Sequence, residues 1–239
     1  MKIDILTLFP EMFSGFFDNS IIKRGLAKGN IEVNFHNFRD YSTNKHHRVD
    51  DTVYGGGAGL LLSVEPIYNC LKAIKTKDSF TIMLSPQGSL FKQKAAYELI
   101  EQKHLIIICG HYEGFDERIK NFIDLEISIG DYVLTGGEVP AMVLLDAVIR
   151  LMPGTIKEDS HLKDSFSEYL LEHPQYTKPY DFMGMTVPDV LVNGNHKEIA
   201  KWQYRERLKK TYQNRPDLLN LSELSATDLA IIKEVEEGK

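Results

Sequence analysis

Cysteine is scarce in this sequence, with two residues among 239. This excludes a framework of several disulfides. A chain of this length, with 43% hydrophobic residues, can bury a sizeable core without one. Cys109 directly follows the apolar run Leu105–Ile108, which predicts a buried and inert thiol. Few cysteines also fit a reducing compartment, and we expect a cytoplasmic protein.

Long apolar runs are missing as well. A membrane-spanning helix needs about 20 consecutive apolar residues, and Asp146 interrupts the best candidate. The N-terminal segment MKIDILTLFPEMF has too short an apolar run for a signal peptide and lacks a small-residue cleavage site. We therefore expect no contact with a membrane.

The chain also lacks an excess of positive charge, because 28 Lys and Arg face 34 Asp and Glu, for a net charge of −6. Proteins that bind nucleic acids without selectivity are usually basic overall, so this class is disfavoured. Basic residues nevertheless gather at residues 39–48 and 197–215. A local nucleic-acid contact therefore stays open.

Two phosphate-binding fingerprints are absent. The first apolar stretch leads into TLFPEMF, without the G-x-G-x-x-G of dinucleotide-binding folds or an acidic residue placed for a ribose. No Walker-type G-x-x-x-x-G-K-[ST] occurs either. An enzyme with a phosphate-bearing cofactor is therefore a distant alternative.

What the sequence does contain is a regular alternation of strand and helix patterns up to about residue 154. Several of the strand patterns are apolar on both faces, which predicts a parallel sheet covered by helices on both sides, an α/β fold. The expected strands are 2–9, 31–38, 80–84, 105–109 and 125–129. The expected helices are 20–27, 63–75, 91–102, 115–122 and 139–152.

The pattern changes after residue 154, and we predict three parts: a domain at 1–154, a linker at 155–170 and a mainly helical domain at 171–239. The linker begins with the polar, aperiodic segment TIKEDSHLK. We expect a first helix over Ser165–Glu172, since Ser165 and Glu168 have the spacing of a capping box. Further helices are expected near 195–213 and 225–237.

Glycines follow the later strands in three stretches: LSPQGSL (84–90), CGHYEGFDER (109–118) and IGDYVLTGGEVP (129–140). Ligands of open α/β sheets bind at the carboxyl ends of the strands, where all three stretches are expected, so they could form one pocket. The alternative is that each glycine is a plain turn residue.

Charge indicates which ligand such a pocket would take. Glu138 stands at the start of a helix, where it satisfies the helix dipole and would repel a phosphate. Glu113, Asp116 and Glu117 add negative charge in the neighbouring stretch. A neutral or cationic ligand that approaches the backbone past glycines is favoured. S-adenosylmethionine qualifies, because it carries an adenosine, a sulfonium cation and no phosphate.

The stretch YSTNKHHRVDDTVYGGGAGLLL (41–62) combines histidines, acids and glycines. His46, His47, Asp50 and Asp51 match no compact zinc pattern. Tyr54 next to Gly55–Gly57 suits a mobile loop that closes on a substrate. A merely exposed, flexible loop is the alternative.

Three further features have both a structural and a functional interpretation. Asp164 could stabilise a helix N-terminus or act as a general base on a moving segment. Arg150 could simply complement the C-terminal dipole of the 139–152 helix. The segment 196–215 mixes basic and aromatic residues, which suits either an RNA contact or a solvated helix face.

Taken in order, these motifs resemble the bacterial tRNA (guanine-37-N1)-methyltransferases, a family of the SPOUT class of knotted methyltransferases. The motifs are YGGGAG, LSPQG, GHYEGFDER, SIGDYVLTGGE, AVIRLMPG, LLEHPQYTKP and NGNH, and the match extends over nearly the whole chain. Where the family usually has PYGGGPGM, this chain has Val53, Ala58 and Leu60. Proline stiffens a loop, so the two missing prolines change the mobility expected of this one.

The resemblance implies a parallel sheet with a deep C-terminal trefoil knot, a small mainly helical C-terminal domain, and a homodimer whose active site lies at the subunit interface. It also implies that S-adenosylmethionine binds among the three glycine-bearing stretches. The residues matched to the cofactor are Ser85, Pro86, Gly110, Tyr112, Glu113, Ile129, Gly130, Tyr132, Leu134, Gly136, Gly137 and Pro140.

By the same resemblance, Asp164 is the general base that removes the N1 proton of guanine 37, and Arg150 stabilises the charge that develops at O6. The linker is expected to become ordered when tRNA binds, and a divalent cation, Mg²⁺, is implied without an evident ligand set. Residues expected to contact guanine or tRNA are Arg48, Asp50, Tyr54, Gly55, His196, Lys201 and Arg205.

Two alternatives stay open. One is a SPOUT methyltransferase that acts on another RNA position, and the other is a noncatalytic RNA-binding protein that keeps the knot as a scaffold. The presence of Asp164 and Arg150 argues against the second.

Overall fold

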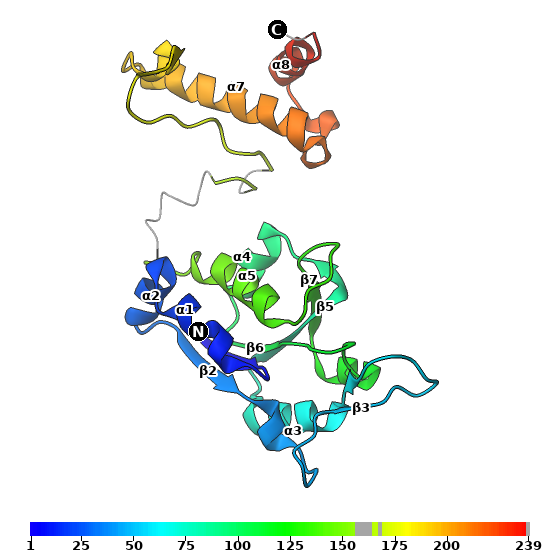
Figure 1. Cartoon of the computed structure of the whole chain (residues 1–239). Helices are drawn as coiled ribbons and strands as arrows, with labels where there is room; N and C mark the ends of the chain where they lie inside the picture. Colours follow the sequence, from blue (N-terminus) through cyan, green and yellow to red (C-terminus); the bar gives the residue numbers. More distant parts are fainter. Residues whose placement is uncertain (156–163, 167–168, 238–239) are drawn as a thin grey trace. The chain divides into compact units, whose positions relative to one another are not determined.

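The computed structural model describes residues 1–155, 164–166 and 169–237, and the chain divides into two compact units, Met1–Lys157 and Glu158–Lys239 (Figure 1). Most of the linker predicted at 155–170, and Glu168 of the predicted capping box, lie outside the described residues.

The first unit is built on a five-stranded sheet in the order β2-β1-β6-β5-β7, and every pairing in it is parallel. This confirms the α/β prediction. The strands are β1 (Lys2–Leu6), β2 (Glu32–His36), β5 (Ser79–Leu90), β6 (His104–Ile108) and β7 (Leu125–Ser128). Every residue of the central strand β6 is buried, as expected for a sheet covered on both faces.

Helices cover both faces of this sheet (Figure 1). One face packs against α1 (Ser14–Phe17), α2 (Ser20–Ala27), α4 (Gln93–Leu99) and α5 (Glu138–Ile149). The other face packs against α3 (Val64–Ile74) and a 3-10 helix at Glu117–Phe122. Two apolar cores result, and Ile5 and Leu144 belong to the first while Leu6 and Ile67 belong to the second.

The remaining elements of this unit are short. Two 3-10 helices span Pro10–Phe13 and Phe38–Tyr41. The two-residue strands β3 (Asp50–Asp51) and β4 (Leu61–Leu62) pair antiparallel and close the loop between them.

Two predicted boundaries in this unit need correction. The first strand ends at Leu6 instead of residue 9, because Thr7 turns its hydroxyl to accept a hydrogen bond from the amide of Phe9. The strand expected at 80–84 continues as β5 to Leu90, with a register shift against β7 between Leu84 and Ser89. The stretch LSPQGSL is therefore an irregular part of a strand, in which Pro86 lacks the ladder donor of other residues.

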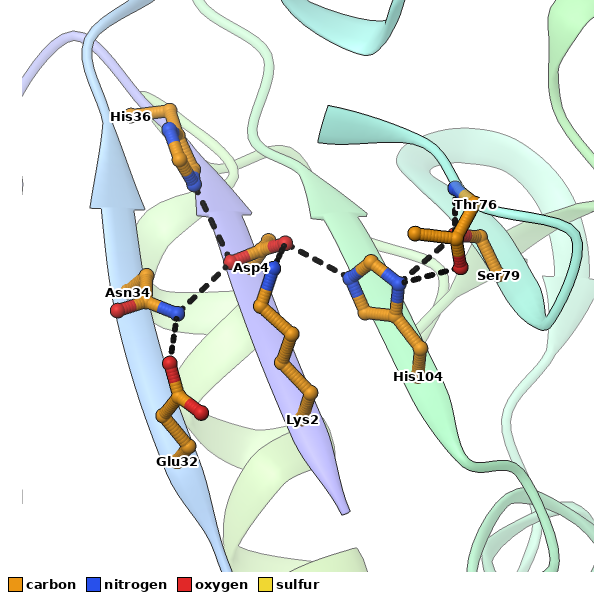
Figure 2. Close-up of polar contacts among 8 residues, drawn as sticks. All are labelled: Lys2, Asp4, Glu32, Asn34, His36, Thr76, Ser79 and His104. Atoms are coloured by element: carbon orange, nitrogen blue, oxygen red, sulfur yellow. Dashed lines mark hydrogen bonds and ion pairs between the residues drawn. The ribbon is translucent and has the colours of Figure 1, made fainter. Parts of the chain in front are cut away.

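A buried polar network crosses β2, β1 and β6 on the α3 face (Figure 2). The fully buried carboxylate of Asp4 accepts hydrogen bonds from Lys2 Nζ at 2.8 Å and His104 Nε2 at 2.7 Å. It also contacts Asn34 Nδ2 at 3.1 Å and His36 Nε2 at 3.2 Å. Burial by itself would raise the pKa of Asp4, but these hydrogen bonds outweigh it and the pKa is lowered.

The second unit is mainly helical in the residues described. Its long helix α7 (His196–Asn214) packs against α8 (Ala226–Glu236) through a small core of Leu170, Leu208, Ile231 and Ile232. Short elements are β8 (Asp181–Phe182), β9 (Met185–Thr186) and 3-10 helices at Asp189–Leu191, Pro216–Leu218 and Leu221–Glu223. Both expected helices, near 195–213 and 225–237, are therefore present.

The helix predicted over Ser165–Glu172 is wrong for the described residues of that range. Phe166 and Tyr169 have positive φ angles of 72° and 60°, which a right-handed helix does not permit. The Ser165 hydroxyl accepts a hydrogen bond from the amide of Glu172 at 3.0 Å, so it closes a turn instead of capping a helix. In the part of the chain described, no helix is long and apolar enough to cross a membrane.

Candidate cofactor pocket

A pocket of about 400 Å³ lies at the carboxyl ends of β5, β6 and β7, where the three glycine-bearing stretches meet. Every residue that the resemblance assigns to the cofactor lines it. These residues are Ser85, Pro86, Gly110, Tyr112, Glu113, Ile129, Gly130, Tyr132, Leu134, Gly136, Gly137 and Pro140. The sequence prediction that the three stretches form one pocket is therefore confirmed in geometry.

The first wall comes from the irregular part of β5. The Ser85 hydroxyl donates to Glu126 Oε1 at 2.6 Å and accepts from the amide of Gln87 at 3.0 Å. Gly88 lies directly on the backbone of β7, where an added Cβ would be 2.5 Å from the amide nitrogen of Ile127. This close approach requires glycine, because any side chain would separate the two strands.

The second wall is the loop after β6. Its backbone is tied to the segment that ends the 50–62 loop, since the amide of Glu113 donates to the carbonyl of Leu60 at 3.0 Å and the amide of Leu62 donates to the carbonyl of Gly114 at 2.9 Å. Asp116 accepts hydrogen bonds from Arg118, which lower the pKa of its carboxyl. The negative charge of Asp116 is thereby compensated.

The third wall is the turn that opens α5. The amide of Gly137 donates to the carbonyl of Gly110 at 2.8 Å, and a Cβ at Gly137 would lie 2.6 Å from the amide nitrogen of Gly110. The interpretation of this glycine as structural is thus correct in part. It lets two pocket walls touch through their backbones, and it lines the pocket as well.

Glu138 lies just behind this wall. Its carboxylate is 1% exposed and accepts a hydrogen bond from the Thr7 hydroxyl at 2.6 Å. His111 Nε2 approaches the other oxygen at 3.1 Å, and the imidazole packs against Phe9 with 4.7 Å between the ring centroids. Neither Thr7 nor His111 was predicted as a site residue. The histidine of GHYEG, directly after an expected pocket glycine, was the available signal.

The pKa values of two further groups near the pocket, Lys120 and Cys109, are raised by their surroundings. Lys120 pairs with Glu117 at 3.0 Å and with Glu126 at 3.2 Å, and these carboxylates raise its pKa. Burial, and then the charge of Glu138, raise the pKa of the Cys109 thiol well above its usual value. The thiol therefore stays protonated and unreactive, as the sequence predicted.

The 50–62 loop borders the pocket. Leu61 lines it, whereas Arg48 and Tyr54 are exposed, and the Tyr54 side chain is 99% accessible. Asp50 belongs to β3, and Gly55 has a φ of 87° that favours glycine. Asp50, Tyr54 and Gly55 therefore lie on one hairpin that is anchored beside the cofactor pocket, and Arg48 directly precedes it.

The sequence matches the model of the tRNA (guanine-1)-methyltransferase TrmD family over residues 1–221. The chain belongs to this family. It is 53% identical to a tRNA (guanine-N(1)-)-methyltransferase of Dictyoglomus turgidum over 99% of this chain and 97% of the relative. Relatives of the same name are 54% identical in Macrococcus caseolyticus and 52% identical in Bacillus cereus, each over the full length of both chains.

In this TrmD-family chain, Arg150 does not line the cofactor pocket. It caps the C-terminal end of α5 and lines a separate pocket of about 290 Å³. The other residues of that pocket are Gly15, Phe16, Asn19, Ile21, Ile22 and Asp146. Asp164 belongs to the second unit.

The basic helix predicted to contact tRNA is α7, and the remaining substrate residues lie on it. His196 is its first residue, Lys201 pairs with Glu198 at 2.9 Å, and Arg205 pairs with Glu234 of α8. Arg207, in the same basic run, is buried and reaches the carbonyl of Leu171. The interpretation of the segment 196–215 as a fully solvated helix face is therefore wrong at Arg207.

No group of three or more His, Cys, Asp or Glu side chains that could hold a metal ion occurs among the described residues. His46, His47, Asp50 and Asp51 accordingly do not form such a group. The Mg²⁺ implied by the resemblance has no ligand set in the described part of the chain.

Proposed function

We propose that this TrmD-family protein transfers the methyl group of S-adenosylmethionine to N1 of guanine 37 in the anticodon loop of tRNA. Membership of the family makes it a tRNA (guanine-N1)-methyltransferase, and the similar proteins above carry that name. One observation carries the cofactor assignment: every residue that the resemblance matches to S-adenosylmethionine lines a single pocket of the first unit.

The pocket suits this cofactor chemically. Backbone from three loops surrounds it and can offer N–H and C=O groups to an adenosine. Lys120, which lines the pocket, is paired with two carboxylates and is therefore poorly placed to bind a phosphate. S-adenosylmethionine supplies an activated methyl group on sulfur.

Guanine N1 becomes nucleophilic only after its proton is removed. In the proposed mechanism Asp164 accepts that proton, and Arg150 stabilises the negative charge that spreads to O6. A bond then forms between N1 and the methyl carbon while the carbon–sulfur bond breaks, and the neutral thioether leaves with the electron pair. The protein must hold N1 in line with this bond, and we assign that task to Asp50, Tyr54 and the loop around them.

We also propose that the enzyme works as a homodimer with its active site at the subunit interface. The pocket lies at the N-terminal end of α5 and Arg150 caps the other end of this 12-residue helix, about 18 Å away at the usual rise per residue. Arg150 from a second copy could meet the pocket where Arg150 of the same chain stays distant.

The expected trefoil knot is part of this proposal. After β7, at one edge of the sheet, the chain returns to the ends of β6 and β1, where Gly137 bonds to Gly110 and Glu138 bonds to Thr7. A knotted path needs such a return across strands already laid down, which most chains avoid.

For the rest of the chain we propose a domain at 1–154, a linker at 155–170 that becomes ordered on tRNA, and a tRNA-binding domain at 171–239. The cationic residues of α7 would contact RNA phosphates. Because tRNA is the substrate, we place the protein in the cytoplasm. The implied Mg²⁺ is assigned no step, since the described residues offer it no ligand set.

The test uses purified protein, labelled S-adenosylmethionine and unmodified tRNA transcripts that carry G37 or A37. We expect transfer to G37 alone, mapped to N1, and loss of transfer in Asp164→Ala. The matched control is Asp78→Ala, which removes an exposed carboxylate in the loop before β5 and should transfer normally.

Each other outcome points to a particular alternative. Transfer to the A37 transcript, or transfer that survives Asp164→Ala, would support a SPOUT enzyme that acts on another RNA position. Cofactor binding without any transfer would support the RNA-binding scaffold.

A further inference from the structure

Glu138 is the most deeply buried of the carboxylates beside the cofactor pocket. Its carboxylate is 1% exposed, so water screens it little. Its partners are the Thr7 hydroxyl at 2.6 Å and the imidazole of His111 at 3.1 Å. Among the described residues, no lysine or arginine forms an ion pair with it.

The backbone of Gly136 and the imidazole of His111, which both line the pocket, separate this carboxylate from it. Gly136 lines the pocket, and a Cβ added there would lie 2.6 Å from Glu138 Oε2 and 2.4 Å from His111 Nε2. Glycine at position 136 therefore leaves room for the carboxylate of Glu138 directly behind the pocket wall. A buried charge acts through such a thin wall with little dielectric screening.

The other acids around the pocket are neutralised or screened. Asp116 is paired with Arg118, and Lys120 lies between Glu117 and Glu126. Glu113 is exposed, so its field is weakened by water and salt. Glu138 is thus the carboxylate beside the pocket that water screens least, and no lysine or arginine of the described chain pairs with it.

We propose that Glu138 is a specificity-determining residue that makes the pocket favour the sulfonium form of its cofactor over the neutral thioether product. The inference rests on the proposed function, because it takes S-adenosylmethionine as the ligand. The substrate carries one more positive charge than S-adenosylhomocysteine, on its sulfur, and the attraction between this charge and the buried carboxylate is what distinguishes the two ligands. Methyl transfer removes this charge, so the attraction ends when product forms and product release is eased. Thr7 is the positioning residue that holds the carboxylate toward the wall.

The experiment measures dissociation constants of the full-length protein for S-adenosylmethionine and S-adenosylhomocysteine by calorimetry. The variant is Glu138→Gln, which keeps the shape of the side chain and removes its charge. We expect the affinity for S-adenosylmethionine to fall about tenfold, as for the loss of one moderately screened charge contact. The affinity for the thioether should change less than about twofold, so the ratio of the two constants shifts.

Glu126→Gln is the matched control, because Glu126 also lines the pocket but shares Lys120 as a counter-charge. Its removal is expected to leave the ratio of the two constants unchanged, even if both affinities move. A second pair, Thr7→Val and Thr7→Ser, tests the same idea without removing the charge. The valine should shift the ratio in the direction of Glu138→Gln, and the serine should restore it.

The outcomes are distinct. Equal loss of both ligands in Glu138→Gln would mean a purely structural role and would overturn the inference, as would the same ratio shift in Glu126→Gln. If Glu138→Gln fails to fold, the two Thr7 variants decide the question. An unchanged ratio of the two dissociation constants in Thr7→Val would then overturn the inference. Failure of the unsubstituted protein to bind either ligand would instead refute the proposed cofactor.

Discussion

Gly137 and Gly88 bring backbone against backbone at the cofactor pocket. A Cβ would lie 2.6 Å from the Gly110 amide nitrogen at the first position and 2.5 Å from that of Ile127 at the second. Side chains of any kind are therefore excluded there for packing reasons, before any ligand is considered. The pocket depends on these two contacts for its shape.

A substitution at Gly137 tests this residue-scale argument. We expect Gly137→Ala to lower the free energy of unfolding by about 1–3 kcal/mol, because the added methyl group meets backbone that cannot turn away. S-adenosylmethionine binding should weaken by at least about tenfold, since the walls formed by Gly110 and Gly137 separate. Urea unfolding and calorimetry measure the two effects.

Gly15→Ala is the control for this substitution. No atom lies within 4 Å of a Cβ at Gly15, and its φ is not positive. Its stability should therefore change by less than about 1 kcal/mol. Normal cofactor affinity in Gly137→Ala would show that the pocket tolerates separation of its walls.

At the scale of elements, the polar network around Asp4 joins three neighbouring strands inside an otherwise apolar sheet face (Figure 2). Lys2 and the ring nitrogens of His36 and His104 face the carboxylate directly, while Asn34 contributes an amide. On the elements packed on this face, burial raises the pKa of Tyr41 and Cys70, and both groups are close enough for the charges of Asp4 and Asp40 to raise it further. A buried carboxylate needs such partners to be ionised.

Stability should therefore depend on pH through Asp4. Its pKa is lowered in the folded protein, so its contribution is present above the unfolded value, about 4, and is lost as pH falls through the folded value. We expect Asp4→Asn to lower the free energy of unfolding by about 2–4 kcal/mol near neutral pH. The difference from the unsubstituted protein should shrink in acid.

Urea unfolding of Asp4→Asn and of the unsubstituted protein is measured at neutral pH and near pH 3, above and below the ordinary carboxyl pKa. Asp78→Asn, at an exposed position, should show no such dependence. A difference between Asp4→Asn and the unsubstituted protein that stays constant, or grows, in acid would contradict the assignment of Asp4 as the ionised centre of the network.

The elements also show where sequence patterns suffice. The helices at 63–75 and 139–152 were predictable because their burial repeats with the helical period. The strand at 105–109 was predictable because its short apolar run is unbroken, as in a sheet covered on both faces. The helix expected at 165–172 was not correct, because Ser165 closes a turn through the amide of Glu172, seven residues on. Local spacing suggests a cap but does not reveal which amide the hydroxyl will meet.

At the scale of the whole molecule, both cysteines report on global opening. Cys70 and Cys109 are buried, and burial raises the pKa of Cys70 to about 12 despite a hydrogen bond with Tyr41. Thiolate is the reactive form, so a native protein near pH 8 offers almost none. We expect both thiols to resist a disulfide reagent in the folded protein and to react rapidly in guanidinium chloride.

Spectroscopic thiol titration measures this, and a saturating amount of S-adenosylmethionine should slow the residual native labelling further. Rapid labelling of one thiol in the native state would reveal a local opening around β6 or α3. The helix that carries Cys70 and the strand end at Cys109 lie on different parts of the core, so the two rates separate local from global opening.

Residue patterns are enough to predict the parallel α/β sheet, the three stretches at its carboxyl edge and the family, because each of these follows from local periodicity or from motifs in a fixed order. Contacts between residues far apart in the chain could be found only in the folded protein. Thr7 bonds to Glu138 across 131 positions, Gly137 rests on Gly110, and Arg207 is buried within a basic run. Local patterns encode which face of an element is buried, whereas the path of the chain decides what that face touches.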